Sequence, residues 1–263
     1  GGARSRYHSF DVDANGLPPL AWPANFASFS LTGQFGRYRD GLAGGGADAS
    51  ALYLVWAGAN DLQDVLRLAQ VSGPDAAGAR LVEAVGDVAG VIGGLVGLGA
   101  RQFMVPTLPD IGAMPVVAAF GAQAQEAARQ YSIAFNQAID QALRSFAGVP
   151  ELEVLRFDAF GLLDEVVRSP AANGFSDIET ACLQGLYLAP TPGAPAPTIC
   201  ANPDEHLFWD VVHPSAAAHV ILADAMYRQV RAAFVPEPSL PALLVVGVFF
   251  LGIFRRPRTA SLV

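Results

Sequence analysis

Two short motifs in this sequence contain residue types that could catalyse a reaction. In the stretch F-W-D-V-V-H-P-S, Asp210 stands three residues before His213. A carboxylate bound to one ring nitrogen of a histidine fixes the tautomer of the ring and leaves the other nitrogen available as a general base. A D-x-x-H turn can place both side chains on one side of a short loop. A surface histidine before a helix gives the same pattern, so the spacing alone is weak evidence.

The second motif, G-A-N-D, follows the apolar run A-L-Y-L-V-W. Gly58 permits a tight turn after this run. Asn60 then lies at the end of a predicted strand and near the start of a helix, where its amide could donate a hydrogen bond to a developing oxyanion. Asparagine also caps helices well, and the tetrapeptide by itself favours capping.

The two motifs together resemble the GDSL/SGNH hydrolase family of lipases and esterases, in particular its bacterial secreted branch with lecithinase- and haemolysin-type members. The resemblance covers most of residues 1–234. The block L-Y-L-V-W-A-G-A-N-D matches the one that contains the family's oxyanion Asn, here Asn60. The block around F-W-D-V-V-H-P-S matches the one with the triad Asp and His, here Asp210 and His213. In G-A-R-Q-F-M-V-P-T-L-P-D-I-G, Thr107 stands where Asn is common, and the opening G-G-A-R resembles the block of the oxyanion Gly, here Gly2.

The resemblance implies a serine ester hydrolase that transfers an acyl group to water. His213 would act as the base, Asp210 would orient it, and the Gly2 N–H and the Asn60 amide would bind the oxyanion. The family's nucleophile is the Ser of a G-D-S-L motif, which this sequence does not contain. We therefore expect that a segment with the first strand and this Ser is missing, and that the chain as it stands has little or no esterase activity. The alternative is a non-catalytic envelope protein that uses the same fold as a binding or structural module.

Alternating apolar and helical patterns predict the elements that position these motifs. Strands are expected at 51–56, 102–106 and 152–158, and helices at 26–38, from about 61, and at 74–98, 115–146, 159–168 and 215–234. Strands that alternate with long helices predict a parallel sheet covered on both faces, with its site at the carboxyl ends of the strands. The resemblance implies a flavodoxin-like three-layer α/β/α sandwich that lacks its first segment. A membrane-spanning helix at 74–98 is a weaker alternative, because its apolar stretch is short and follows Glu83 and Asp87.

Composition and charge exclude some classes of function. The chain has 263 residues, of which 52% are hydrophobic, enough for one sizeable domain. Its net charge of −8 argues against nucleic acid as a partner, because Lys and Arg bind phosphates.

His8, His206 and His219 do not combine with Asp or Cys in metal-ligand spacing, so we expect no metal and no cofactor. We expect His206 in a surface loop, with a place in the pocket lining as the alternative. We expect His219 as an ordinary half-buried helix residue, and Asp110 as a turn or capping residue that could border the site.

The chain has two cysteines, Cys182 and Cys200, which flank a segment rich in Pro and Gly. Such a loop has little core of its own, so we expect a disulfide between them if the protein is exported. Two unrelated buried thiols are the alternative.

The C-terminal tail contains P-E-P at 236–238, an apolar run of 15 residues at 240–254, and then Arg255, Arg256 and Arg258. As a helix the run would measure about 22 Å, short for a bilayer core of about 30 Å. The three features in this order resemble the PEP-CTERM sorting signal of Gram-negative bacteria, which implies recognition and cleavage by an exosortase at the membrane. We therefore expect a hydrolase domain at 1–234, a sorting signal at 235–258 and a tail at 259–263, in a protein exported to the periplasm or outer surface and anchored at least transiently. A plain anchor or an aggregation-prone tail is the alternative.

Overall fold

The computed structural model describes residues 30–185 and 196–234. The chain divides into two compact units, residues 1–222 and 223–263, and the division falls inside helix α7 (Ala216–Phe234). All of the described strands belong to the first unit. The described part of the second unit is the C-terminal half of α7, where the Arg231 guanidinium lies 5.9 Å from the centre of the Tyr227 ring.

Three parallel strands form the main sheet in the order β1-β2-β3, as the alternating pattern of strands and helices predicted. The strands are β1 (Leu52–Leu54), β2 (Gln102–Pro106) and β3 (Glu153–Phe157). The register places Tyr53 beside Phe103 and Phe103 beside Val154. The fold class is therefore α/β with a parallel sheet.

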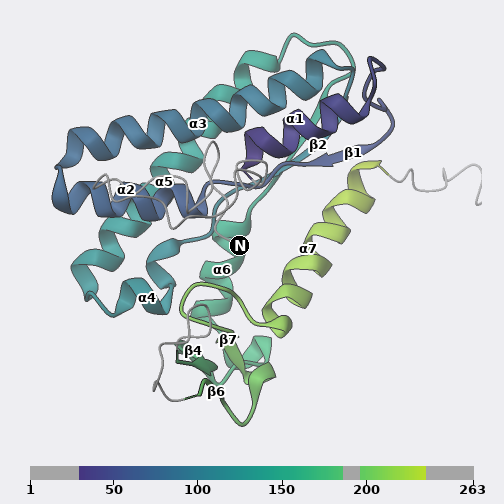
Figure 1. The fold of residues 1–263 in the computed structure, drawn as a ribbon. Helices are drawn as coiled ribbons and strands as arrows, with labels where there is room; N and C mark the ends of the chain where they lie inside the picture. The colour runs from purple at the N-terminus through teal and green to yellow at the C-terminus, as the bar shows by residue number, and fades with distance from the viewer. Residues whose placement is uncertain (1–29, 186–195, 235–263) are drawn as a thin grey trace, which may run out of the picture. The chain divides into compact units, whose positions relative to one another are not determined.

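Of the described helices, one precedes the first strand, and the others connect strands or follow the last of them (Figure 1). They are α1 (Leu31–Gly41), α2 (Ala59–Val71), α3 (Pro74–Gly97), α4 (Pro115–Ala118), α5 (Ala122–Leu143), α6 (Ala159–Arg168) and α7.

Two predicted helix boundaries were wrong. The helix predicted at 115–146 is broken before α5, because Gly121 adopts a φ of +89° that ends α4 and begins α5. The helix predicted from 26 begins at Leu31, because the Ser30 hydroxyl accepts a hydrogen bond from the Gly33 N–H and caps it; residues 26–29 lie outside the described part.

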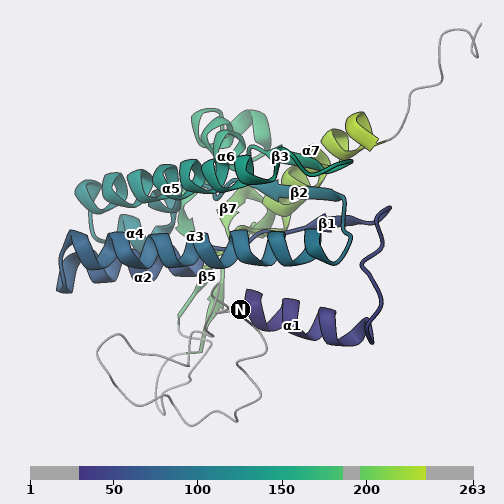
Figure 2. The same ribbon diagram turned by 90° about the horizontal axis from the view of Figure 1, so that it is seen from above.

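The sheet is covered on both faces at its central strand. Phe103 and Met104 point to opposite faces of β2, and both are almost completely buried. Parallel crossovers share one handedness, so the connections from β1 to β2 and from β2 to β3 fall on the same face of a sheet ordered 1-2-3. As expected from this rule, α3 packs against both α2 and α5 (Figure 2).

Helix α3 is a core helix. It buries Ala84, Val88, Val91, Ile92 and Leu95 in the hydrophobic core of the first unit. Within the described ranges, no helix is both long and apolar enough to cross a bilayer.

Two small sheets precede the Asp210 motif. Strand β4 (Asp177–Ala181) pairs in parallel with β7 (His206–Phe208), and β5 (Leu183–Gln184) pairs antiparallel with β6 (Thr198–Ile199). The sequence predicted an irregular loop here, so the pairing at its ends corrects that prediction. Cys182 and Cys200 form the predicted disulfide, with an S–S distance of 2.03 Å. Its position links β5 and β6 at the base of the segment between them.

Candidate active site

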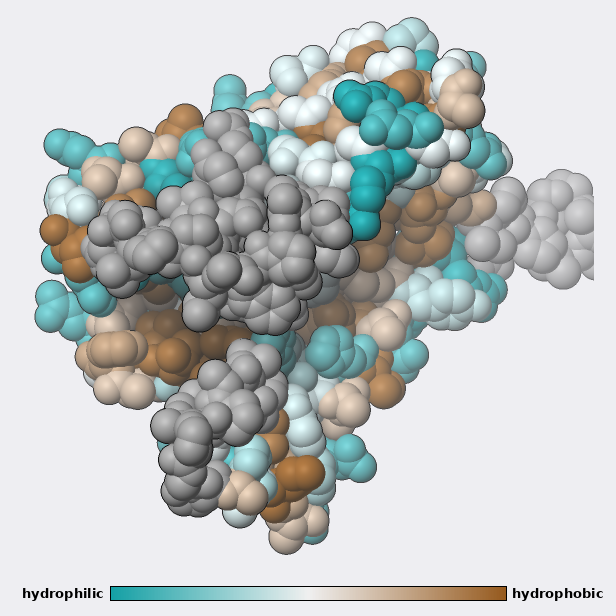
Figure 3. Space-filling model, viewed as in Figure 1, coloured by the Kyte–Doolittle hydropathy of each residue, from teal (hydrophilic) through white to brown (hydrophobic). Residues whose placement is uncertain are grey.

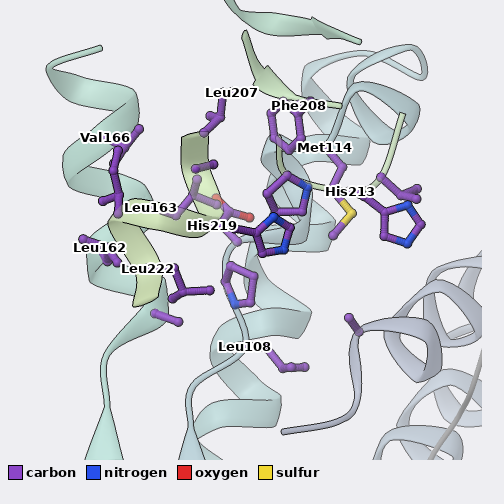
Figure 4. Close-up of a pocket in the computed structure, with 18 of the residues that line it drawn as sticks. Leu108, Met114, Leu162, Leu163, Val166, Leu207, Phe208, His213, His219 and Leu222 are labelled. Carbon is purple, nitrogen blue, oxygen red and sulfur yellow. The ribbon is translucent and has the colours of Figure 1, made fainter. Parts of the chain in front are cut away.

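A cavity of about 310 Å³ lies in the first unit at the carboxyl ends of the three sheet strands. Trp56 follows β1, Leu108 and Asp110 follow β2, and Ala159 follows β3; all four line the cavity. The site therefore lies at the edge of the sheet that the α/β pattern predicted. Its volume is at the lower end of the range for small-molecule sites. Most of the remaining wall is apolar and comes from α6, β7 and α7 (Figure 4): Leu162, Leu163, Val166, Leu207, Phe208, Ala218, Ile221 and Leu222.

Asp210 and His213 lie together at this cavity, as the D-x-x-H spacing predicted. The Asp210 Oδ2 atom is 2.7 Å from His213 Nδ1, and its Oδ1 atom accepts hydrogen bonds of 2.8 Å from the backbone N–H groups of Val212 and His213. The Asp210 side chain is 5% exposed, whereas that of His213 is 50% exposed. An ionised carboxylate only accepts, so Nδ1 carries the proton and Nε2 is the nitrogen available for chemistry.

The loop that contains this pair is closed tightly between β7 and α7. The Trp209 N–H donates to the His213 carbonyl, and the buried Ser215 donates its N–H to the Leu207 carbonyl. The Ser215 hydroxyl also accepts from the Ala218 N–H, at 3.2 Å, in the first turn of α7. These bonds fix the backbone on both sides of His213 and therefore the direction of its ring.

The turn between β1 and α2 requires the glycine that the sequence predicted. Gly58 has a φ of +125°, and a Cβ atom there would lie 2.5 Å from the Phe135 ring. An ion pair between Asp61 and Arg80 of α3 also holds the first turn of α2. Their side chains are 0% and 10% exposed. The close approach of the Phe135 ring to Gly58 and the Asp61–Arg80 ion pair both position the segment that contains Asn60.

Asn60 lies in the first turn of α2 and is half-buried. Its Oδ1 atom accepts a hydrogen bond of 3.4 Å from Gln63 Nε2. Ala57 and Ala59 line the cavity, but Asn60 is not among its lining residues. Its oxyanion role stays a prediction. Gly2, the second predicted oxyanion donor, lies outside the described residues.

The sequence model of the family described as GDSL-like Lipase/Acylhydrolase matches residues 1–226. The chain belongs to this family. It is similar to two GDSL esterase/lipases of Arabidopsis thaliana: At1g29660, 32% identical over 148 residues that cover 52% of this chain and 39% of that protein, and At5g03810, 30% identical over 146 residues that cover 51% and 40%. The chain thus spans about two fifths of the length of these relatives. The α/β fold with its parallel sheet is consistent with this family.

The sequence analysis missed two polar residues that hold the loop after β2 in this GDSL-type chain. The Asn136 amide of α5 makes two hydrogen bonds with the Leu108 backbone, at 2.7 and 2.9 Å. One turn earlier, the Ser132 hydroxyl accepts from the Ile111 N–H at 3.2 Å. Both side chains are buried beside Phe135. A signal was present in the sequence, because two polar residues four positions apart fall on the apolar stripe of a helix only where they have partners.

Asp110 both caps a short turn and lines the cavity, as its position in L-P-D-I-G suggested. Arg129 of α5 donates to Asp110 at 2.6 Å and makes two hydrogen bonds of 2.9 and 2.8 Å with Asp164 of α6. Its guanidinium also lies 4.7 Å from the centre of the Phe160 ring. Hydrogen bonds from Arg129 lower the pKa of Asp164 below its ordinary value, against the opposing effect of burial. Arg129 therefore joins three elements that surround the cavity.

The other two described histidines differ in position. His206 begins β7 and its side chain is 16% exposed, which corrects its predicted place in a surface loop. It does not line the cavity, and its Nδ1 lies 3.7 Å from Asp177 Oδ2. His219 does line it and is exposed, which corrects its prediction as an ordinary half-buried residue. Helix α7 begins immediately after the His213 loop, so its first turns face the site. Among the described residues that line the cavity there is no Ser, Thr or Cys.

The Arg129–Asp164 pair predicts a pH-dependent contribution to stability. The folded pKa of Asp164 lies below its ordinary value of 3.8, so the charged pair stabilises the folded chain above that pH and loses this effect as the pH falls through the folded pKa. We expect Asp164→Asn to lower the free energy of unfolding by about 0.5–1 kcal/mol at pH 7, allowing for solvent screening. In urea titrations at pH 3 the loss should be smaller than at pH 7, because the stabilisation declines as the pH falls toward the lowered folded pKa. An equal loss at both pH values would show that packing, not charge, accounts for the effect; Asp224→Asn is the control.

Proposed function

We propose that this chain supplies the general base and the substrate cavity of a serine ester hydrolase. The observation that supports it best is the buried Asp210 carboxylate, 2.7 Å from a His213 ring that lines an apolar cavity. A serine hydroxyl attacks the ester carbonyl, and His213 Nε2 takes its proton and passes it to the departing alcohol. Water then repeats the sequence on the acyl-enzyme. Asp210 holds the ring and stabilises its charged form.

The oxyanion of each tetrahedral intermediate is bound by N–H donors. We assign the Asn60 amide and the Gly2 N–H to this role, together with the N–H of the serine. One such donor lowers the barrier by about 3 kcal/mol. The first turn of α2, held by Gly58 and the buried Asp61, keeps Asn60 at the carboxyl end of β1.

The wall of the cavity supports an aliphatic ester as the substrate. Its lining is dominated by Leu, Ile, Val and Phe side chains from α6, α7 and β7. Polar groups placed there without partners would lose hydrogen bonds with water. An acyl or alcohol chain of several carbons therefore fits this cavity better than an acetylated polysaccharide does.

The nucleophilic serine belongs, in this proposal, to a segment that contains the family's Gly-Asp-Ser motif and a strand beside β1. In the described sheet β1 is one of the two edge strands. Leu52 and Leu54 point to the same face as Met104, yet they are 39% and 56% exposed whereas Met104 is 2% exposed. Figure 3 shows hydrophobic surface over the position of β1. An apolar face that is covered at β2 and open at β1 supports a further element over this edge.

The tail at 235–258 lies outside the described residues, and we propose that it is a PEP-CTERM sorting signal read by an exosortase. The Cys182–Cys200 disulfide supports export, because such bonds persist in oxidising compartments. The protein would then reside in the cell envelope of a Gram-negative bacterium, held at the membrane until its tail is cleaved.

Mass spectrometry of the mature protein from the native envelope tests the sorting proposal. We expect a C-terminus that lacks the Arg255 and Arg256 cluster. Recovery of the intact chain through Val263 would instead indicate a permanent anchor.

Activity measurements test the hydrolase proposal. We expect a longer polypeptide, in which a Gly-Asp-Ser segment precedes residue 1, to hydrolyse p-nitrophenyl esters of medium-length acids, and residues 1–263 alone to do so at the background rate. His213→Ala in the longer polypeptide should lower kcat by at least about 10³-fold, because the general base is lost. His206→Ala, outside the cavity, is the matched control. Absence of turnover by the longer polypeptide would favour a non-catalytic binding or structural module, and undiminished turnover by His213→Ala would reject the assigned base.

A further inference from the structure

Few polar groups line the cavity, and most of them are occupied. Trp56 Nε1 donates to the Thr107 carbonyl at 3.1 Å. The Asp110 carboxylate accepts from Arg129 and from the Gly112 N–H. His213 is committed to Asp210 through Nδ1. The remaining polar side chain of the described lining is His219.

His219 presents a hydrogen-bond acceptor to this cavity. Its Nδ1 atom lies 2.9 Å from the Ser215 carbonyl oxygen, one turn earlier in the chain. A carbonyl oxygen only accepts, so Nδ1 must carry the hydrogen. In the neutral ring Nε2 then has a lone pair and no hydrogen. Because Ser215 is buried and bonded to Leu207 and Ala218, the atom that selects this tautomer is itself fixed.

Besides His219, the residues of α6 and α7 that line the cavity are apolar. Ala218, Ile221 and Leu222 line the cavity from the same helix as His219, and Leu162 and Leu163 line it from α6. Figure 4 labels His219 together with Leu162, Leu163 and Leu222 among the side chains that line the cavity. Apart from His213 Nε2, which the proposed function assigns to the serine proton, His219 supplies the histidine acceptor of this lining. Its ring is exposed, so water pairs Nε2 in the absence of a ligand. A ligand that covers the ring without a hydrogen-bond donor displaces that water and leaves the acceptor unpaired, which favours a ligand with one donor at the matching position.

We propose that His219 Nε2 accepts a hydrogen bond from a hydroxyl group on the aliphatic chain of the substrate, so that the preferred substrates are hydroxylated aliphatic esters. The ester part of this inference rests on the proposed function. A hydroxyl group suits the site better than an amide, because an amide would also bring a carbonyl oxygen for which the Leu and Ile side chains have no donor. His219 thus determines specificity, while His213 is the base.

Ligand binding tests this inference without any nucleophile. The chain of residues 1–263 is titrated with methyl octanoate, with its 2-, 3- and 4-hydroxy derivatives, and with 2-hydroxyoctyl acetate, which places the hydroxyl on the alcohol part. We expect at least one hydroxylated ester to bind roughly three- to tenfold more tightly than methyl octanoate, the effect of one net hydrogen bond. The ¹⁵N resonance of His219 Nε2 should shift with that ligand and less with methyl octanoate.

Variants of His219 separate the hydrogen bond from packing. His219→Leu should abolish or reverse the preference for the hydroxylated ester while methyl octanoate binds at least as well as before. His219→Gln, which keeps a polar group, should retain part of the preference, and His206→Leu, outside the cavity, should leave it unchanged. The inference is wrong if no ester binds, if no hydroxylated ester binds more tightly, or if His219→Leu keeps the preference. Hydroxyl-selective binding without hydrolysis by the longer polypeptide would reject the hydrolase proposal and leave this one standing.

Discussion

The site depends on one hydrogen-bonded pair, the buried Asp210 carboxylate and the exposed His213 ring. A carboxylate with 5% of its side chain exposed is costly to bury unless its oxygens are bonded. Here one oxygen accepts from two backbone N–H groups and the other binds the imidazole. The same bonds that make burial tolerable therefore set the loop conformation, the tautomer of the ring and the exposure of Nε2.

The elements around this pair act mainly by fixing the backbone of the segments that border the cavity. The Cys182 and Leu183 N–H groups donate to the carbonyls of Phe208 and Trp209, so the disulfide-linked strands support the chain immediately before Asp210. On the opposite side of the cavity, Asn136 holds the Leu108 backbone and Arg129 joins Asp110 to Asp164. These bordering segments thus pair most of their polar groups within the protein, so that mainly apolar side chains, together with His213 and His219, contact a ligand.

Local patterns in the sequence were sufficient for the elements with strong signals. The strand at Gln102–Pro106 and the helix at Ala159–Arg168 lie where they were predicted, because an apolar run and a capping Asp158 mark them. The spacing of Asp210 and His213 allowed their contact but did not establish it, and the resemblance to the family favoured it over a plain surface histidine. The pairing of Asp177–Ala181 with His206–Phe208 could not be predicted, because strands of five and three residues are too short to show a period that separates them from loops. The place of His219 depends on how α7 is rotated against its neighbours, and its mixed apolar and polar sequence does not specify that rotation.

The central claim is that His213 activates a serine outside the described residues. Labelling the longer polypeptide with a fluorophosphonate, followed by peptide mass spectrometry, tests it most directly. We expect one adduct, on the Ser of a Gly-Asp-Ser motif that precedes residue 1, and its loss in His213→Ala. An adduct on a serine within residues 30–185 or 196–234, or labelling that His213→Ala leaves unchanged, would contradict the claim.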